Sequence, residues 1–503
     1  MADFDLAVIG GGINGTAIAR DAAGRGLHVL LVEQNDLGSG TSSASSKLIH
    51  GGLRYLEHRA FRLVREALHE REVMLRMAPH VIRPMRFMLP PVPGLRSALW
   101  LRLGLFIYDR LGGRKLLPGT RTVDLTHHPV GQPLKRTFRY GYEYSDCSVD
   151  DARLVVLNAL DAKERGADIR PRTRCMRAER HRDWELVLNT RGRRATASAR
   201  VVVNAAGPWI AQVAENVLRV PLSAPVRLVK GSHIVVRRNF DHDRGYAFQA
   251  ADGRIVFALP FAQNFTLIGT TDENFIGDVN SPAPDADEIN YLTNVVNVYF
   301  RETVSPADVV WAFAGVRSLI EDGADRPEDV TRDYSLTLDE KFGEAPVLTV
   351  YGGKITTSRK LAEAVMAKIG HFFEALPAWT ADSTLPGGDF APDEFDVEVT
   401  RARNRWPFLE DATARRLVHA YGTRIDRVLG AAKSFDELGH RYTGDLTSAE
   451  LRYLAEQEWA QTAEDVLWRR SKLGLTAGIT EREAIDEFLA KATGIPASGA
   501  ARG

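Results

Sequence analysis

The stretch DLAVIGGGINGTAIARDAAGRGLHVLLVE, residues 5–33, decides the fold of this chain. The apolar run at residues 6–9 is typical of a buried strand, and a second apolar run at 28–32 ends at Glu33. The segment between the two runs is typical of a helix with small residues on its packing face: Ala17, Ala19, Ala22 and Ala23. Because both strands are apolar throughout, the sequence predicts a parallel, right-handed β-α-β unit that is buried on both faces.

The turn between the first strand and the helix has the spacing G-x-G-x-x-G, formed by Gly10, Gly12 and Gly15. In this motif the first glycine permits a tight turn, the second lets the backbone approach a pyrophosphate, and the third lets the helix pack against the strand. The helix N-terminus offers N–H groups to phosphates, and Glu33 can accept hydrogen bonds from ribose hydroxyls. The spacing and its context together predict a dinucleotide-binding site.

After Glu33 the chain leaves the β-α-β pattern. An NAD dehydrogenase of the doubly wound type would continue with further β-α units. Here a tract rich in serine and threonine follows, then a long excursion, and a strand ending in Asn-Ala-Ala-Gly returns at 201–207. Such an interruption by a substrate domain fits a flavoprotein better than a nicotinamide enzyme, so we predict FAD as the cofactor.

Composition and charge exclude several classes of protein. Lys plus Arg and Asp plus Glu both number 65, so the net charge is zero, which argues against a chain-wide nucleic-acid binder. The two cysteines, Cys147 and Cys175, have no metal-type spacing, and we predict no metal site. No stretch reaches the roughly 18 apolar residues of a membrane-spanning helix, so any membrane contact is expected to be peripheral.

Eight further stretches carry a family resemblance. They are VIGGGINGTAIARDAAGRG (8–26), TSSASSKLIHGGLRYLE (41–57), EYSDCSVDDARLV (143–155), NAAGPW (204–209), KGSHIVV (230–236), IGTTD (268–272), GVR (315–317) and GGKITTSRKLAE (352–363). They resemble the FAD-dependent (respiratory, aerobic) glycerol-3-phosphate dehydrogenases, within the D-amino-acid-oxidase-like flavoprotein superfamily. The stretches at 41–57 and 352–363 are the most specific. Ser318 departs from the family, which usually has proline there.

We therefore expect an α/β fold. A doubly wound, Rossmann-like FAD-binding domain of the glutathione-reductase type is interleaved with an antiparallel-sheet substrate domain, and an α-helical C-terminal domain follows. The first two domains are expected within residues 1–380 and the third at 381–503. The FAD-binding parts are expected at about 1–75, 145–225 and 310–375, and the substrate-binding parts at about 76–144 and 226–309.

The resemblance also implies a reaction. It is the oxidation of sn-glycerol 3-phosphate to dihydroxyacetone phosphate, with hydride passing from C2 to N5 of non-covalently bound FAD and electrons passing on to a membrane quinone. It further implies a cytoplasmic protein attached peripherally to the inner face of the cell membrane. A soluble glycerol-3-phosphate oxidase that makes hydrogen peroxide, a flavin amine or amino-acid oxidase, and a non-enzymatic flavin-binding protein remain alternatives. A homodimer is compatible with the sequence.

The substrate end of the site requires cations and a base. A phosphate dianion is best held by guanidinium groups, and Arg54 and Arg317 are the candidates, with Tyr55 as a hydroxyl donor. Lys354 is expected to hold a substrate oxygen or to stabilise negative charge on the reduced flavin.

The C2 hydroxyl must also lose a proton, which calls for a general base. His50 and His233 are both candidates, since an unperturbed histidine titrates near neutral pH, and the sequence leaves the choice between them open. The catalytic residues that we predict are thus His50, His233, Arg317 and Lys354.

The residues expected to contact the cofactor come from the glycine-rich turn, the end of the second strand, the Ser/Thr tract, NAAGPW and GGKITT. They are Gly10, Gly12, Ile13, Asn14, Gly15, Glu33, Thr41, Ser42, Ser45, Ser46, Lys47, Leu48, His50, Ala206, Gly207, Gly352, Lys354, Ile355, Thr356 and Thr357.

One segment combines apolar, aromatic and basic residues. In RSALWLRLGLFIYDRLGGRK (96–115) five cations face a single carboxylate, Asp109. A helix of this kind can lie in a lipid headgroup interface, or it can bury its apolar side within the protein, and the sequence favours neither. The basic segment Trp468-Arg469-Arg470 is a second, weaker candidate for membrane contact.

Overall fold

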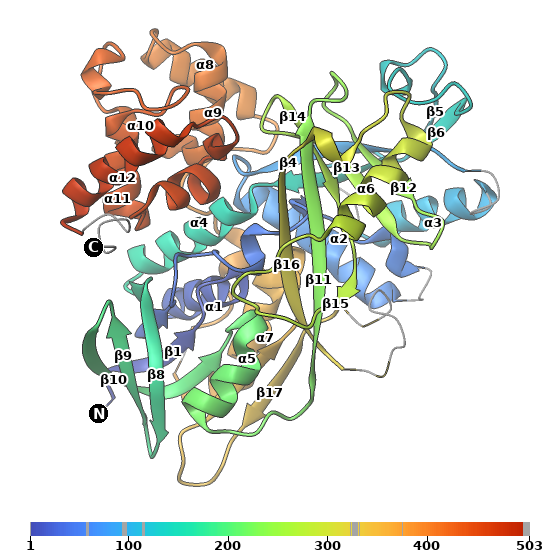
Figure 1. Cartoon of the computed structure of the whole chain (residues 1–503). Helices are drawn as coiled ribbons and strands as arrows, with labels where there is room; N and C mark the ends of the chain where they lie inside the picture. Colours follow the sequence, from blue (N-terminus) through green and yellow to red (C-terminus); the bar gives the residue numbers. More distant parts are fainter. Residues whose placement is uncertain are drawn as a thin grey trace.

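The structure, a computed structural model, describes residues 2–56, 60–92, 98–112, 116–321, 323, 330, 332–374 and 376–495. In this part of the chain two β-sheets lie beside each other and a cluster of helices covers one end (Figure 1).

The first sheet is built around the β-α-β unit. Its eight described strands are β1 (Phe4–Ile9), β2 (Val29–Val32), β7 (Asp168–Arg170), β8 (Thr173–Arg180), β9 (Trp184–Thr190), β10 (Arg193–Asn204), β17 (Ser335–Asp339) and β18 (Val347–Tyr351). The order is β17-β18-β10-β1-β2-β7, and β8 and β9 are appended through the first half of β10. The central strands, from β18 to β7, are parallel, as their continuous apolar runs predict.

Three helices cover one face of this sheet. The helix α1 (Ile13–Gly24) packs between α4 (Asp151–Glu164) and α7 (Ser358–Ile369), and all three contribute to the same buried core. The helix α4 begins after Asp150, whose side chain accepts a hydrogen bond from the backbone N–H of Arg153 and caps the helix.

The second sheet lies toward the right of Figure 1 and is antiparallel except where β12 meets β4. Its ten described strands are β3 (Leu48–Ile49), β4 (Ile82–Leu89), β5 (Arg121–Asp124), β6 (Tyr140–Val149), β11 (Val226–Arg237), β12 (Gly245–Gln249), β13 (Ile255–Phe261), β14 (Phe265–Gly269), β15 (Glu273–Asn274) and β16 (Val309–Ile320). The helices packed around this sheet are α2 (Phe61–Met77), α3 (Ala98–Leu111) and α6 (Ala286–Tyr299). A short helix, α5 (Ile210–Gln212), follows β10.

The helices after residue 378 form the C-terminal domain. They are α8 (Phe395–Arg405), α9 (Asp411–Tyr421), α10 (Ile425–Leu429), α11 (Ser448–Glu458) and α12 (Ile479–Thr493), with a π-helical turn at Asp465–Arg470. These helices enclose a core of their own and contact the helix layer of the first sheet through α4 (Figure 1).

The predicted fold class is therefore confirmed: an α/β domain, an antiparallel substrate sheet and a helical C-terminal domain. The apolar helix expected near the segment 96–115 ends earlier than predicted, at Leu111, while Arg96, Arg114 and Lys115 lie outside the described residues. No helix in the described ranges is both long enough and apolar enough to cross a membrane.

The contact between α1 and β1 gives a stability prediction. A Cβ atom on Gly15 would lie 1.9 Å from the carbonyl oxygen of Gly10, so Gly15→Ala forces the helix away from the strand. We expect this change to lower the free energy of unfolding, measured by denaturant titration, by about 1–3 kcal/mol. Gly370→Ala is the matched control, because a Cβ there meets no atom within 4 Å. Equal stabilities of the two variants would contradict the packing argument.

Candidate active site

A single large cavity of about 1060 Å³ runs between the two sheets. The first sheet contributes the carboxyl ends of β1, β2 and β10, which is where ligands bind in open α/β sheets. The second sheet contributes β12, β13 and β16, and the chain segments that cross between the sheets complete the wall. The cavity therefore has a nucleotide end at the first sheet and a second end beside the antiparallel sheet.

The glycine-rich turn forms the nucleotide end. Gly10 has φ +118°, a conformation that favours glycine, and Gly15 allows the close helix contact described above. The N-terminus of α1 therefore faces the cavity directly, and the backbone N–H of Ile13 donates to Ser42 Oγ at 2.9 Å. The turn and the Ser/Thr tract are thus held side by side.

Glu33 lies at the end of β2, as predicted, and lines the cavity. Its Oε2 accepts from the Gly11 N–H at 2.7 Å, and its Oε1 accepts from the Asn35 N–H at 2.8 Å. Burial raises the pKa of this carboxyl, while the two N–H donors oppose that shift.

The Gly352-Gly353 turn meets the N-terminus of α1 on the other side. Both glycines have positive φ angles, of 64° and 96°, and Asn14 Nδ2 donates to the carbonyl of Gly352 at 3.1 Å. Asn14 Oδ1 is buried without a hydrogen-bond partner among the described residues, and this side chain lines the cavity. The Asn14 Oδ1 is thus an unpaired hydrogen-bond acceptor at the cavity wall. It lies beside a glycine turn whose free space a Cβ atom would fill. Both features fit a bound dinucleotide such as FAD.

The Ser/Thr tract runs along the cavity toward its second end. Thr41 Oγ1 donates to the carbonyl of Val316 at 2.5 Å, which ties the tract to β16. Lys47 instead turns into the protein, where its Nζ pairs with Asp151 at 2.8 Å, and Ser45 Oγ donates to the same carboxylate at 2.7 Å. The Lys47 charge is therefore used to fix the tract, and its side chain does not line the cavity.

A cluster of cations lies at the second end of the cavity. Asp272 Oδ1 accepts from Arg317 Nη1 at 2.7 Å and from Arg332 Nη2 at 2.9 Å, so one carboxylate holds two guanidinium groups in place. Gly231 leaves room for them, since a Cβ there would lie 2.7 Å from Arg317 Nη2. All three charged side chains line the cavity.

Lys354 and Tyr55 complete this cluster. The Lys354 Nζ lies 3.7 Å from the centre of the Tyr55 ring. Burial lowers the pKa of Lys354, and Tyr55 partly offsets that shift. Burial by itself would raise the pKa of the Tyr55 hydroxyl, but the cations Lys354 and Arg332 outweigh it and the net shift is downward. The end of the cavity is therefore strongly electropositive, which suits a phosphate dianion.

The two candidate bases have different positions. His50 lines the cavity, and its pKa is lowered to about 4 by burial and by the cations Lys354 and Arg71. His233 lies behind the wall, where its Nε2 and Ser46 Oγ are 2.9 Å apart and its ring stacks on Phe313. Its pKa is also lowered, mainly by burial. Both imidazoles are neutral at neutral pH, and of the two His50 is the one that lines the cavity.

A buried network supports the turn that follows His50. The Gly51 N–H donates to Tyr108 Oη at 2.8 Å, and Tyr108 donates to Asp146 at 2.8 Å. Arg71 pairs with the same carboxylate at 2.6 Å. Tyr108 lies on α3, so this helix is connected directly to the loop that carries His50.

The predicted site residues that line the cavity are Gly10, Gly12, Ile13, Asn14, Glu33, Thr41, Ser42, Ser45, Ser46, Leu48, His50, Tyr55, Ala206, Gly207, Arg317, Gly352, Lys354, Ile355 and Thr356. Those placed behind the wall are Gly15, Lys47, His233 and Thr357. The side chain of Arg54 lies outside the described residues.

Two charged residues of the cationic cluster were not among the predicted site residues. Asp272 is the last residue of the IGTTD stretch, so its motif carried a signal for the site. Arg332 lies in a segment without periodicity or a motif, and its place beside Asp272 depends on the tertiary fold.

The cavity also has an apolar arm. Its walls are formed by residues that follow the His50 turn and by one side of α3: Leu53, Leu56, Phe61, Trp100, Leu103 and Ile107. Three large apolar residues of α3 are exposed to solvent, with Leu99 81%, Trp100 72% and Phe106 55% accessible, and Trp100 is both exposed and part of the arm. The arm therefore connects the region of His50 with an apolar patch on the surface.

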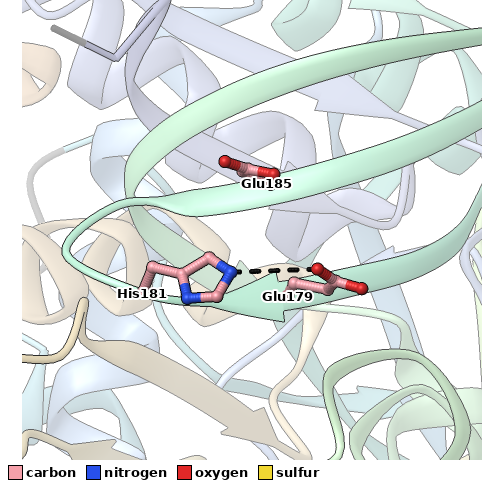
Figure 2. A group of neighbouring side chains, drawn as sticks. All are labelled: Glu179, His181 and Glu185. Atoms are coloured by element: carbon pink, nitrogen blue, oxygen red, sulfur yellow. Dashed lines mark ion pairs between the residues drawn. The ribbon is translucent and has the colours of Figure 1, made fainter.

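A separate group of possible metal ligands lies outside the cavity lining. Glu179, His181 and Glu185 converge on the β8–β9 hairpin (Figure 2), where their ligand atoms lie within 4.8 Å of one another. The side chains of Glu179 and His181 are 41% and 62% exposed, and Glu179 pairs with Arg177. An exposed group of this kind, with one carboxylate already paired, gives no reason to revise the expectation that the active site uses no metal.

Comparisons with known proteins agree with this geometry. Residues 5–359 match the family described as FAD dependent oxidoreductase, and residues 378–494 match the C-terminal domain of alpha-glycerophosphate oxidase. The chain is 49% identical to glycerol-3-phosphate dehydrogenase of Pseudomonas aeruginosa, covering 97% of this chain and 95% of the relative. It is also 49% identical to D-erythritol 1-phosphate dehydrogenase of Brucella abortus, covering 96% and 97%. The crystal structure of glycerol-3-phosphate dehydrogenase from Bacillus halodurans complexed with FAD aligns with a TM-score of 0.77 at 27% identity, covering 98% of this chain and 92% of that chain.

The electropositive cluster predicts anion binding. A ligand that binds the folded state raises the melting temperature, so inorganic phosphate should stabilise the wild-type protein. We expect Arg332→Met to remove most of this phosphate-dependent shift, because one of the two guanidinium groups on Asp272 is lost. Arg170→Met, which removes a surface arginine paired with Asp168, is the control and should keep the shift. An undiminished shift in Arg332→Met would place the anion elsewhere.

Proposed function

The chain belongs to the FAD-dependent glycerol-3-phosphate dehydrogenases, and we propose that a membrane quinone takes up the electrons of its reaction. One observation carries the proposal: a single cavity joins a dinucleotide cradle, a cationic cluster and an apolar arm that reaches the surface. Each part corresponds to one requirement of the reaction, namely a flavin, a phosphorylated substrate and an apolar electron acceptor.

The cofactor is FAD, which supplies the acceptor for the substrate hydride. We assign its pyrophosphate to the N-terminus of α1 and its adenosine ribose to Glu33, on the basis of the glycine cradle. The Gly352-Gly353 turn and Lys354 then lie where the flavin end is expected, and positive charge at a helix start favours a reduced flavin.

The substrate phosphate is assigned to Arg317, Arg332 and Lys354. Two guanidinium groups fixed by one carboxylate present their remaining N–H donors at set angles, which suits a tetrahedral dianion. Asp272 pairs with both guanidinium groups and Asp333 adds a second negative charge near Lys354, so the three cations still leave the cluster a net positive charge for the ligand. Tyr55 adds a hydroxyl donor next to Lys354.

We assign to His50 the role of the general base that accepts the proton of the C2 hydroxyl. A general base must be unprotonated, and the low pKa of His50, about 4, keeps its imidazole neutral at neutral pH. The hydrogen bond from the Gly51 N–H to Tyr108 holds the turn next to this ring. The position of His233 behind Ser46 supports a role in orienting the tract.

We assign the binding site of the electron acceptor to the apolar arm of the cavity. Its walls suit an apolar ring and tail, and its outer end meets the exposed apolar side of α3. Arg102 and Arg110 are exposed on the same helix, so α3 has the apolar and basic character of a helix lying in a lipid headgroup region. This arrangement supports peripheral attachment to the inner face of the cell membrane.

D-erythritol 1-phosphate is a second candidate substrate, because the Brucella relative that acts on it is as similar as the Pseudomonas one. Both molecules carry a phosphate and a secondary hydroxyl. The ratio of kcat/KM values for the two substrates decides between them, and we expect it to favour glycerol 3-phosphate.

The assignment of His50 predicts a kinetic effect. We expect His50→Gln to lower kcat by roughly 10²–10⁴-fold with a soluble dye as electron acceptor, with little change in KM, because the phosphate contacts remain. In the wild-type enzyme at saturating substrate, the rate should stay level on acidification past pH 6.5, the ordinary histidine value, and fall only as pH approaches about 4. A rate that already falls near pH 6.5 would show that His50 is not the general base. An unchanged kcat in His50→Gln would show the same.

The assignment of α3 to membrane contact predicts that vesicle binding and quinone turnover can be lost while turnover with a soluble dye is kept. The double variant Trp100→Glu, Phe106→Glu should lose binding to vesicles of phosphatidylethanolamine and phosphatidylglycerol and lose turnover with a long-chain quinone. Turnover with a soluble dye should remain. Phe342→Glu, at a more exposed phenylalanine away from α3, is the control and should bind vesicles normally. An enzyme that instead produces hydrogen peroxide in proportion to substrate, without need of quinone, would be an oxidase.

A further inference from the structure

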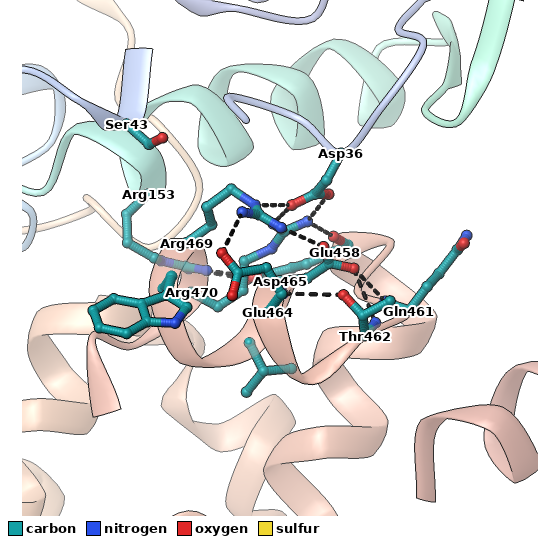
Figure 3. Close-up of polar contacts among 12 residues, drawn as sticks. Asp36, Ser43, Arg153, Glu458, Gln461, Thr462, Glu464, Asp465, Arg469 and Arg470 are labelled. Atoms are coloured by element: carbon teal, nitrogen blue, oxygen red, sulfur yellow. Dashed lines mark hydrogen bonds and ion pairs between the residues drawn. The ribbon is translucent and has the colours of Figure 1, made fainter. Parts of the chain in front are cut away.

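A buried network of ion pairs joins the C-terminal domain to the loop after β2 (Figure 3). Asp36, on this loop, is 2% exposed. It accepts hydrogen bonds from Arg469 Nε at 2.6 Å and from Arg470 Nη2 at 2.9 Å, and Arg470 Nη1 makes a further short contact. Both arginines lie on the π-helical turn of the C-terminal domain. The two arginines of Trp468-Arg469-Arg470, the weaker candidate for membrane contact, are thus buried and paired inside the protein.

Asp36 sits within the segment that forms the nucleotide end of the cavity. Glu33 precedes it by three residues, and the residues 38–42 that follow also line the cavity. The Gly38 N–H donates to the carbonyl of Gly11 at 3.0 Å, so this loop rests directly on the glycine-rich turn. A shift of Asp36 would therefore move the cavity-lining residues that precede it and those that follow it in the chain.

The network of ion pairs also extends to the first sheet. Asp465 accepts from Arg469 at 2.5 Å and from Arg172 at 2.8 Å. The backbone N–H of Arg172 donates in turn to the carbonyl of Asn35, the neighbour of Asp36, at 2.8 Å. Burial would raise the pKa of Asp465, but the surrounding arginines outweigh it and hold the carboxyl ionised.

A second branch reaches α4. Arg470 Nη2 donates to the carbonyl of Glu458 at 2.6 Å, and the Glu458 carboxylate pairs with Arg153 on α4. The first residue of that helix, Asp151, holds Lys47 in the Ser/Thr tract. The C-terminal domain thus contacts one end of this segment directly, at Asp36, and is connected to the other end, at Lys47, through α4.

We propose that Asp36, Arg469 and Arg470 are positioning residues through which the docked C-terminal domain holds the FAD-binding loop in its binding conformation. Retention of the cofactor then depends on a domain that contributes no residue to the cavity wall in the described part of the chain. The proposal requires FAD binding, and it is independent of the substrate and of the electron acceptor.

The physical reason is the cost of an unpaired buried charge. With the C-terminal domain docked, Asp36 is 2% exposed and its charge is balanced mainly by Arg469 and Arg470, with Arg172 at 3.8 Å. Loss of the two closest cations from this buried carboxylate would destabilise the loop in its present position. Coupling between two binding events is reciprocal, so FAD must strengthen the docking by the same factor by which docking strengthens FAD binding.

The test is the FAD affinity of Asp36→Asn in the full-length holoenzyme. This variant keeps the shape of the side chain and removes its charge. We expect the dissociation constant of FAD, measured by flavin fluorescence, to rise roughly 10- to 100-fold, the usual effect of losing a group that orients a binding residue. At saturating FAD the rate of flavin reduction should match the wild type, because Asp36 does not line the cavity.

Glu164→Gln is the matched control. Glu164 pairs with Arg424 at 2.5 Å across the same domain interface, at the opposite end of α4, away from the cofactor loop. We expect this variant to bind FAD with wild-type affinity. A change in FAD affinity in Asp36→Asn no larger than that in Glu164→Gln would overturn the proposal, because it would show a general effect of the interface.

Two further measurements test the same coupling if Asp36→Asn does not fold. Arg469→Lys keeps a charge near Asp36 but loses the planar fork, so FAD should dissociate severalfold faster, and an unchanged rate would overturn the proposal. In the wild-type protein, FAD should slow amide hydrogen exchange in residues 465–475. Equal exchange with and without FAD would also contradict the coupling.

Discussion

The close approach of α1 to β1 is the constraint on which the site depends. The backbone oxygen of Gly10 occupies the space where a Cβ of Gly15 would be, so the helix begins directly at the carboxyl end of the strand. Its first turn therefore faces the cavity, where Ser42 and the Gly352 carbonyl are hydrogen-bonded to it. Segments separated by more than 300 residues in the chain thus converge on one helix end, which is the part of the protein best suited to hold a pyrophosphate.

Charged residues in the structure have two distinct tasks. Lys47 and Asp36 are fully paired in the interior and fix the segment between them, which forms one wall of the cavity. Arg317 and Lys354 line the cavity, where their charge is available to a phosphorylated substrate. The first group fixes the wall and the second acts on the ligand, so charged residues beside the same cavity differ in role.

Most of the fold was predictable, because glycine spacing and apolar periodicity are local signals that tertiary contacts reinforce. The cavity positions of His50, Tyr55 and Lys354 also agree with prediction, since each lies in a specific motif. The roles of Arg332 and Arg469 were not predictable in the same way. Their partners, Asp272 and Asp36, lie 60 and 433 residues away in the chain, and only the folded structure pairs them.

The most direct test of the central claim is anaerobic mixing of the purified holoenzyme with glycerol 3-phosphate, while the flavin absorbance near ~450 nm is followed. The structure predicts that the band bleaches within the time of a turnover, that glycerol without phosphate fails to bleach it, and that a quinone restores it. A flavin that glycerol 3-phosphate leaves oxidised would contradict the assignment of the cationic cluster and of the reaction.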